Sequence, residues 1–177
     1  MLSVVNVVGS TIATESDDVL YTWAGPEISV ASTKAYSTQL AVIYLLALYI
    51  GEQLGKFTQE QLSAYIAALE KLPEQIDEML KHKENIQFFA SKYFNASDMY
   101  FIGRNVDYAA SLEASLKLKE ISYIHSEAYA AGELKHGPIS LIEDGTLVIA
   151  LATDARLFDK MMSNIKEVKL SLIHISE

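Results

Sequence analysis

The sequence predicts an α/β fold built from parallel sheets. Short apolar runs, which are typical of buried strands, occur at residues 3–8, 19–22, 99–102 and 147–151. Longer helical stretches separate these runs, and turns that contain glycine connect the two kinds of segment. Strands that alternate with helices in this way favour parallel α/β layers over an all-α or an all-β fold.

Capping signals and apolar periodicity mark five helices. They are predicted at about residues 33–50, 58–71, 74–92, 106–122 and 155–169. Ser32 or Thr33 is a suitable N-cap for the first helix. Thr58, followed three residues later by Gln61, matches a capping box at the second. Pro73 stands where the first turn of the third helix tolerates proline.

The alternation of strands and helices is interrupted once, and this interruption divides the chain. Two α/β blocks are predicted, at residues 1–56 and 96–177, and a helical connector at residues 57–95 joins them. Half of the residues are hydrophobic, which is typical of a folded chain and not of a disordered one.

Composition excludes several classes of function. The formal net charge of −9 argues against nucleic-acid binding and against binding to anionic membranes. The absence of cysteine excludes disulfides, thiol nucleophiles and zinc–thiolate sites, and it fits a cytoplasmic location. No signal peptide is predicted at the N-terminus. The longest apolar run, residues 40–50, has about half the length of a membrane span.

Acid–base side chains are concentrated between residues 113 and 136. At about 100° per residue, Glu113, Lys117 and Glu120 fall within about 60° of one another on a helix. The side chains that flank this arc are apolar, and a polar face lies on the opposite side: Ala109, Leu112, Leu116, Leu118 and Ile121 flank the arc, and Ser111, Ser115, Lys119 and Ser122 lie opposite. We therefore expect the three charges to lie within the buried, apolar face of an amphipathic helix. They form either a structural ion-pair cluster or a general base beside a lysine in a cleft.

Two further segments are candidates for binding. Residues 25–34 carry hydroxyls and small side chains before a helix N-terminus, which suits a polar or anionic ligand, although a simple capped loop has the same composition. His136 stands in a Lys-His-Gly-Pro turn and is expected either to share a cleft with the charged helix or to be merely exposed. His82 and His174 are expected at the surface. The sequence has no metal-ligand spacing and no nucleotide-binding glycine motif.

Two motifs together carry a family resemblance. AGPEISVASTKAYSTQL and LKLKEISYIHSEAYAAGELKHGP resemble the isomerase part of glucosamine-6-phosphate synthases, the isomerising glutamine–fructose-6-phosphate aminotransferases. The resemblance runs from about Val4 to Lys169. It implies sugar-isomerase (SIS) domains of the flavodoxin-like, three-layer α/β type, with the back of the first domain and the front of the second present here.

The resemblance also implies roles for five residues. Glu120 matches the base that moves a proton between C1 and C2 of the sugar, and Lys117 matches the lysine beside it. His136 matches the histidine that opens the sugar ring, which the neighbouring subunit supplies in this family. Val30 and Ser32 match residues that contact the sugar phosphate. The family chemistry uses no metal and no pyridoxal cofactor.

The implied reaction converts fructose 6-phosphate and glutamine-derived ammonia into glucosamine 6-phosphate for amino-sugar and UDP-N-acetylglucosamine synthesis, in a homodimer. Two alternatives stay open: a non-catalytic module that senses sugar phosphates, and a related amino-sugar-phosphate deaminase or deglycase. The family's phosphate loop, glutaminase domain and C-terminal Schiff-base lysine have no counterpart in the sequence, and residues 170–177 depart from the family pattern. We therefore expect a fragment that is inactive alone.

Overall fold

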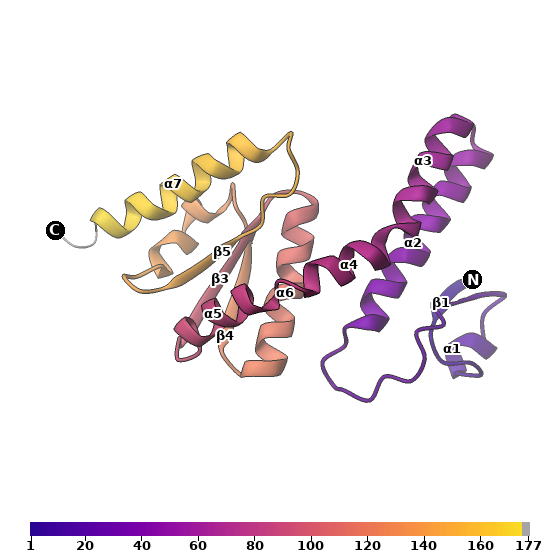
Figure 1. Cartoon of the computed structure of the whole chain (residues 1–177), viewed down its shortest axis with the longest axis horizontal. Helices are drawn as coiled ribbons and strands as arrows, with labels where there is room; N and C mark the ends of the chain where they lie inside the picture. The colour runs from indigo at the N-terminus through magenta and orange to yellow at the C-terminus, as the bar shows by residue number, and fades with distance from the viewer. Residues whose placement is uncertain (175–177) are drawn as a thin grey trace. The chain divides into compact units, whose positions relative to one another are not determined.

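The structure is a computed structural model that describes the backbone of residues 1–174 and the side chains of residues 1–170. The chain divides into two compact units, unit 1 (Met1–Gln87) and unit 2 (Phe88–Glu177). Each unit contains one sheet, and every strand pair in the two sheets is parallel (Figure 1). The predicted fold class is therefore confirmed.

Unit 1 contains a two-stranded sheet followed by helices. Its elements are β1 (Leu2–Val5), α1 (Thr11–Thr14), β2 (Asp18–Tyr21), α2 (Lys34–Gln53), α3 (Gln59–Glu70) and α4 (Leu72–Leu80). β1 is shorter than predicted, because the backbone bends and turns at residues 6–9. The apolar run at residues 40–50 lies in α2. In the part of the chain that the structure describes, no helix has both the length and the apolar character of a membrane span.

The helix caps of unit 1 agree only in part with the sequence. The capping box at α3 is confirmed: the Gln61 amide donates to the Thr58 hydroxyl at 3.2 Å, and the Thr58 amide donates to Gln61 Oε1 at 2.9 Å. Pro73 lies in the first turn of α4, as predicted. Thr33 occupies the N-cap position of α2, but its hydroxyl makes no capping bond. A carboxylate from the preceding loop takes that role, as described below.

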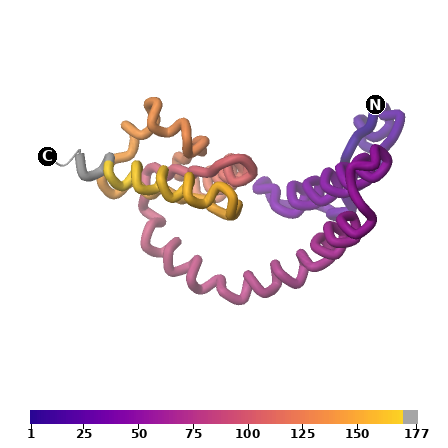
Figure 2. Tube along the Cα trace, turned by 90° about the horizontal axis from the view of Figure 1, so that it is seen from above, coloured from indigo at the N-terminus to yellow at the C-terminus, as the bar shows by residue number. Residues whose placement is uncertain are grey.

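The predicted helix at residues 74–92 is two helices. α4 ends at Leu80, and α5 begins at Lys83 and runs to Tyr93. The amides of Lys81 and His82 bond to carbonyls three residues back, at 3.2 and 3.1 Å, which tightens the turn between the two helices. Figure 2 shows the trace coiling through α4 and α5, from magenta to pink. Neither helix has a buried residue.

Unit 2 contains a three-stranded sheet with the strand order β4-β3-β5. Its elements after α5 are β3 (Asp98–Gly103), α6 (Val106–Ser122), β4 (His125–Ala130), the 3₁₀ turns η1 (Leu134–His136) and η2 (Pro138–Leu141), β5 (Leu147–Ala150) and α7 (Phe158–His174). α7 starts three residues later than predicted, because a turn at residues 154–157 precedes it. Of residues 170–177, which depart from the family pattern, only Leu170 has a described side chain, so the prediction that His174 lies at the surface falls outside the described side chains.

Strand β4 is absent from the prediction. Its sequence, HSEAYA, carries no strongly apolar aliphatic side chain, so it does not match the pattern of a buried strand. β4 forms the edge of the described sheet, pairing with β3 from Asp98 opposite His125 to Gly103 opposite Ala130. Edge strands commonly carry polar residues, since one side of the strand faces solvent.

Helices α6 and α7 cover opposite faces of the sheet in unit 2. Tyr100 and Ile102 of β3 belong to a buried cluster that includes Met161 and Val168 of α7. On the opposite face, Ser126 of β4 makes a hydrogen bond to α6. Since successive side chains of a strand point to opposite faces, these contacts define three layers: helix, sheet, helix (Figure 1).

Candidate functional site

Glu113, Lys117 and Glu120 form a charged triplet on α6. The Lys117 ammonium lies 2.5 Å from Glu120 Oε2 and 3.6 Å from Glu113 Oε1. The side chains of the triplet are 19–26% exposed. The hydrogen bond to Glu120 raises the pKa of Lys117, and the charges of both carboxylates add to this effect, while partial burial opposes it. The triplet therefore holds a charged ammonium against a carboxylate at the surface of unit 2.

The triplet lies on the outer side of α6, and the prediction of a buried, apolar face is wrong. The buried residues of α6 are Asp107, Ser111 and Ser115. Three of the apolar side chains that flank the triplet are exposed: Leu112 49%, Leu116 43% and Ile121 67%. α6 lies so close to β3 that a Cβ on Gly103 would come within 2.4 Å of the backbone of Asp107. Only small side chains fit facing the sheet at this separation.

The serine hydroxyls in this close helix–sheet contact all have hydrogen-bond partners within the protein. Ser115 and Ser126 hydroxyls lie 2.9 Å apart, and Ser126 donates to the Ser115 carbonyl at 2.9 Å. Ser111 donates to the Asp107 carbonyl at 2.7 Å. Because these hydroxyls have partners inside the protein, serines can form the buried face and leucines can form the outer one.

His136 lies at the other end of the sheet from the triplet. α6 begins after the carboxyl end of β3 and ends before the amino end of β4, so Glu120 lies near the amino ends of the strands. His136 follows the carboxyl end of β4 and is exposed. A strand of this length spans about 20 Å. Helix α6 and the turn that carries His136 thus adjoin opposite ends of β4, and of the two expectations for His136, exposure is the one observed.

The second group of predicted residues lies in unit 1, in the β2–α2 loop (residues 22–33). Asn6 organises the start of this loop: its carboxamide oxygen accepts from the amide of Ala24 at 2.9 Å and from the hydroxyl of Thr22 at 3.1 Å. The Asn6 amide group donates to the carbonyl of Gly25 at 2.7 Å. Trp23 adopts a positive φ of 53° between these contacts. A single asparagine thus fixes the path of the chain after β2.

Glu27 organises the end of the loop. Its carboxylate accepts from the hydroxyl of Ser32 at 3.1 Å and from the amide of Thr33 at 3.0 Å. The bond from the Thr33 amide lowers the pKa of Glu27, with smaller contributions from Ser32, from the amide of Ala35 and from the charge of Lys34. The Ser32 hydroxyl is therefore bonded to Glu27, whereas the Val30 side chain is 92% exposed.

Sequence reasoning missed Asn6 and Glu27. Glu27 precedes the helix it caps by several residues, whereas the capping patterns that can be recognised in a sequence place the carboxylate at or after the N-cap. Asn6 offers a weak signal, since asparagine after a strand commonly bonds to nearby backbone. Val30 and Ser32 lie in unit 1, and Lys117, Glu120 and His136 lie in unit 2.

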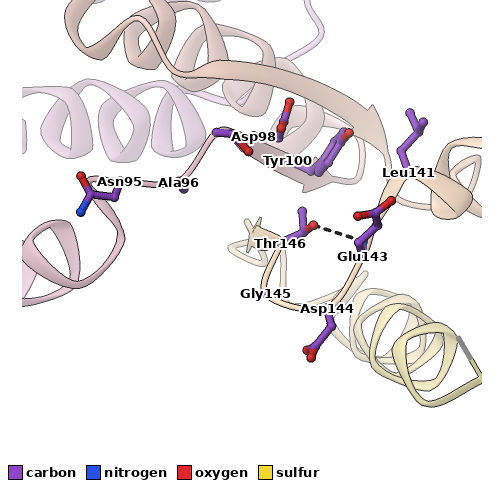
Figure 3. Close-up of a pocket in the computed structure, with 10 residues that line it drawn as sticks. Asn95, Ala96, Asp98, Tyr100, Leu141, Glu143, Asp144, Gly145 and Thr146 are labelled. Carbon is purple, nitrogen blue, oxygen red and sulfur yellow. Dashed lines mark hydrogen bonds between the residues drawn. The ribbon is translucent and has the colours of Figure 1, made fainter. Parts of the chain in front are cut away.

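A pocket of about 480 Å³ opens at the amino end of the sheet in unit 2 (Figure 3). Asp98, Glu143 and Asp144 are among its ten lining residues, and no lining residue is Lys, Arg or His. The Glu143 amide donates to the Thr146 hydroxyl at 3.1 Å across its rim. The carboxylates would repel a sugar phosphate, so this pocket is a poor candidate for that ligand. Within the described side chains, no group of three His, Asp or Glu could hold a metal ion.

Comparison with known proteins connects both groups of residues to one family. The sequence profile of the SIS domain matches residues 1–49 and 92–173. A curated relative, the isomerising glutamine–fructose-6-phosphate aminotransferase of Caldanaerobacter subterraneus subsp. tengcongensis, is 57% identical over 169 residues, which are 96% of this chain and 28% of the relative. The chain therefore spans about a quarter of the length of such relatives.

Solved structures show the same relationship. The C-terminal domain of glucosamine-fructose-6-phosphate aminotransferase from Francisella tularensis superposes with a TM-score of 0.91 at 38% identity, covering 94% of this chain and 47% of that one. Glucosamine-6-phosphate deaminase from Thermotoga maritima superposes with a TM-score of 0.69 at 26% identity, covering 97% and 49%. The resemblance inferred from the two motifs is confirmed, and the chain belongs to the SIS domain family.

Proposed function

We propose that this chain supplies part of the sugar-isomerase site of an isomerising glutamine–fructose-6-phosphate aminotransferase. The reaction would convert fructose 6-phosphate and glutamine-derived ammonia into glucosamine 6-phosphate, for amino-sugar and UDP-N-acetylglucosamine synthesis in the cytoplasm. The observation that carries the proposal is the contact between Lys117 and Glu120 on the outer face of α6. The 57% identity to an aminotransferase of this kind supports it.

The geometry gives each residue of the pair a task. The Glu120 carboxylate, as general base, would move a proton between C1 and C2 of the open-chain sugar. The Lys117 ammonium, 2.5 Å from that carboxylate, would stabilise the negative charge that develops on the adjacent sugar oxygen. Glu113 holds the ammonium from the other side of the helix turn, at 3.6 Å. No step in this sequence needs a metal ion or a pyridoxal cofactor.

The proposal is tested by Glu120→Gln in a full-length aminotransferase that carries this sequence. We expect kcat to fall about 10²–10⁴-fold, because general acid–base catalysis contributes a factor of this size, while KM changes little. Glu84→Gln, an exposed glutamate on α5, is the matched control and should leave kcat unchanged. Wild-type turnover by the Glu120 variant would refute the assignment.

We propose further that His136 acts in the site of a partner subunit of a homodimer. The separation between Glu120 and His136 within unit 2 supports this, since one residue lies near each end of the sheet. Mixing full-length Glu120→Gln and His136→Ala proteins should restore activity, because one site in each mixed dimer then holds both intact residues. If subunits exchange and no activity returns, the two residues act within one subunit.

Val30 and Ser32 are proposed to contact the sugar phosphate from the β2–α2 loop. Sugar-phosphate sensing without catalysis and deamination are not favoured, given that the identity is 26% to the deaminase and 57% to the aminotransferase. The 177-residue chain alone is still predicted to be inactive. Incubation with fructose 6-phosphate and ammonia, followed by detection of glucosamine 6-phosphate, tests that prediction against a Glu120→Gln chain.

A further inference from the structure

The N-terminus of α2 is already occupied by an anion of the chain itself. Helix N-termini carry free amide donors and a partial positive charge, so they commonly bind phosphate groups. In unit 1 the carboxylate of Glu27 accepts from the Thr33 amide at 3.0 Å and from the Ser32 hydroxyl at 3.1 Å. The Ala35 amide and the positive charge of Lys34 favour the same carboxylate. Two donors at this helix end, the Thr33 amide and the Ser32 hydroxyl, are therefore already bonded to an anion of the chain.

The lysine of this segment is also engaged. The Lys34 ammonium donates to the Pro26 carbonyl at 2.6 Å, which closes the loop from the other side. Between these two anchors lie Ile28 and Val30, whose side chains are 96% and 92% exposed. The loop is thus held at its base by polar contacts and displays apolar residues and backbone at its tip.

We propose that Glu27 is a positioning and specificity-determining residue: its carboxylate occupies the N-terminus of α2, holds the β2–α2 loop, and leaves the loop tip to contact the uncharged part of a sugar phosphate. The phosphate group is excluded from this helix end for two reasons. Its charge would be repelled by the carboxylate, and the amide of Thr33 and the hydroxyl of Ser32 already have an acceptor. The sugar contact in this inference rests on the proposed function. The role of Glu27 at the helix end does not.

The test uses the 177-residue chain labelled with ¹⁵N, with inorganic phosphate and fructose 6-phosphate as probes. The variants are Glu27→Ala and Glu27→Gln, and the control is Glu52→Gln, an exposed glutamate at the other end of α2. The amide of Leu62 in α3 reports whether unit 1 remains folded. Two quantities are measured for the Thr33 amide: its hydrogen-exchange rate, and the change in its chemical shift when inorganic phosphate is added.

We expect Thr33 exchange to accelerate about tenfold or more in Glu27→Ala, the factor expected when a bond to a charged acceptor is lost. Glu27→Gln should give a smaller increase, since its one amide oxygen still accepts. Inorganic phosphate should shift the Thr33 amide in Glu27→Ala and leave it unshifted in the wild type and in Glu52→Gln. A purely structural role would produce faster exchange without this gain of phosphate binding.

The outcomes distinguish the role of Glu27 at the helix end from the sugar contact of the loop. Unchanged Thr33 exchange in Glu27→Ala, or an equal phosphate shift in the wild type, would overturn the role of Glu27. Fructose 6-phosphate should shift amides of residues 28–32 in the wild type and bind about tenfold more weakly to Glu27→Ala. If the wild type shows no response to fructose 6-phosphate while the phosphate result holds, the sugar-contact part fails and the role of Glu27 at the helix end stands.

Discussion

Unit 1 and unit 2 both combine parallel strands with helices, yet they bury very different amounts of apolar side chain. Among the described side chains, the buried hydrophobic residues of unit 1 are Ala13 and Leu62, whereas those of unit 2 form a cluster around the central strand β3. Ile102 and Ile142 in that cluster are 0% exposed. Since hydrophobic residues make up about half of each unit, composition does not explain the difference.

The number of strands in each sheet explains this difference in burial. In unit 2, β3 has a neighbour on each side and a helix on each face, so its residues from Met99 to Gly103 are buried. In unit 1, two strands offer too little surface to cover α2, and Ile43, Leu45 and Tyr49 stay 51–61% exposed. Two open apolar pockets of about 410 and 480 Å³ border α2. A two-stranded sheet is marginal by itself, whereas three strands with a packed face can be stable.

The largest expected effect is on the core of unit 2. Ile102→Ala should destabilise unit 2 by about 2–5 kcal/mol, because it removes a fully enclosed side chain and leaves a cavity. Ile43→Ala in α2, where the side chain is 53% exposed, should change stability by less than about 1 kcal/mol. Urea unfolding followed by amide signals of each unit measures both. Equal losses would show that unit 1 has a core of comparable quality.

Hydrogen exchange compares the two units directly. The β3 amides of Phe101 and Ile102 should exchange at least about 100-fold more slowly than the β1 amides of Val4 and Val5, because local opening of a poorly covered sheet requires less free energy. Exchange of the wild-type chain at neutral pH, read by ¹⁵N spectra, gives this ratio. Similar protection in both strands would contradict the comparison.

Acid should weaken unit 2 through Asp107. Its carboxylate accepts from the Thr153 hydroxyl at 2.5 Å and from the Thr153 amide at 2.9 Å, and these bonds lower the pKa of Asp107 below 3.8. A carboxyl group with a lowered folded-state pKa adds stability above the unfolded value, and this stability is lost as the pH falls through the folded pKa. Asp107→Asn should therefore cost about 1–3 kcal/mol at pH 7 and flatten the pH dependence below about pH 4.

The control for this experiment is Asp159→Asn, in the first turn of α7. It should leave the acid dependence of unit 2 nearly unchanged. If Asp107→Asn retains the wild-type pH dependence, then other carboxyl groups cause the loss of stability in acid.

The smallest expected effect concerns the triplet on α6. Glu120→Gln should lower the pKa of Lys117 more than Glu113→Gln does, because the hydrogen bond to Glu120 makes the largest contribution to raising it. The distances, 2.5 and 3.6 Å, favour the same order. Titration of ¹⁵N-labelled lysine side chains measures both shifts, with Glu84→Gln as the unaffected reference. The reverse order would mean that Glu113 is the main partner of Lys117.

Local signals in the sequence were enough for most elements. The capping box at Thr58 and the apolar run of β3 predicted their elements from neighbouring residues alone, because a cap or a buried strand is defined within a few positions. The predicted limits of α6, residues 106–122, are those observed. The family resemblance followed from two contiguous motifs and was confirmed by comparison with known proteins.

Tertiary contacts decided the rest. Angles along α6 correctly placed the charged triplet opposite the serines, but which side is buried depended on how closely the helix approaches Gly103. β4 became a strand because β3 offered it hydrogen-bonding groups, in spite of its polar sequence. Glu120 and His136 adjoin opposite ends of β4, and the direction of that strand cannot be read from helical periodicity. Sequence alone determined most of the elements and the family, whereas β4 and the buried faces required the packed sheet, since these depend on residues far apart in the chain.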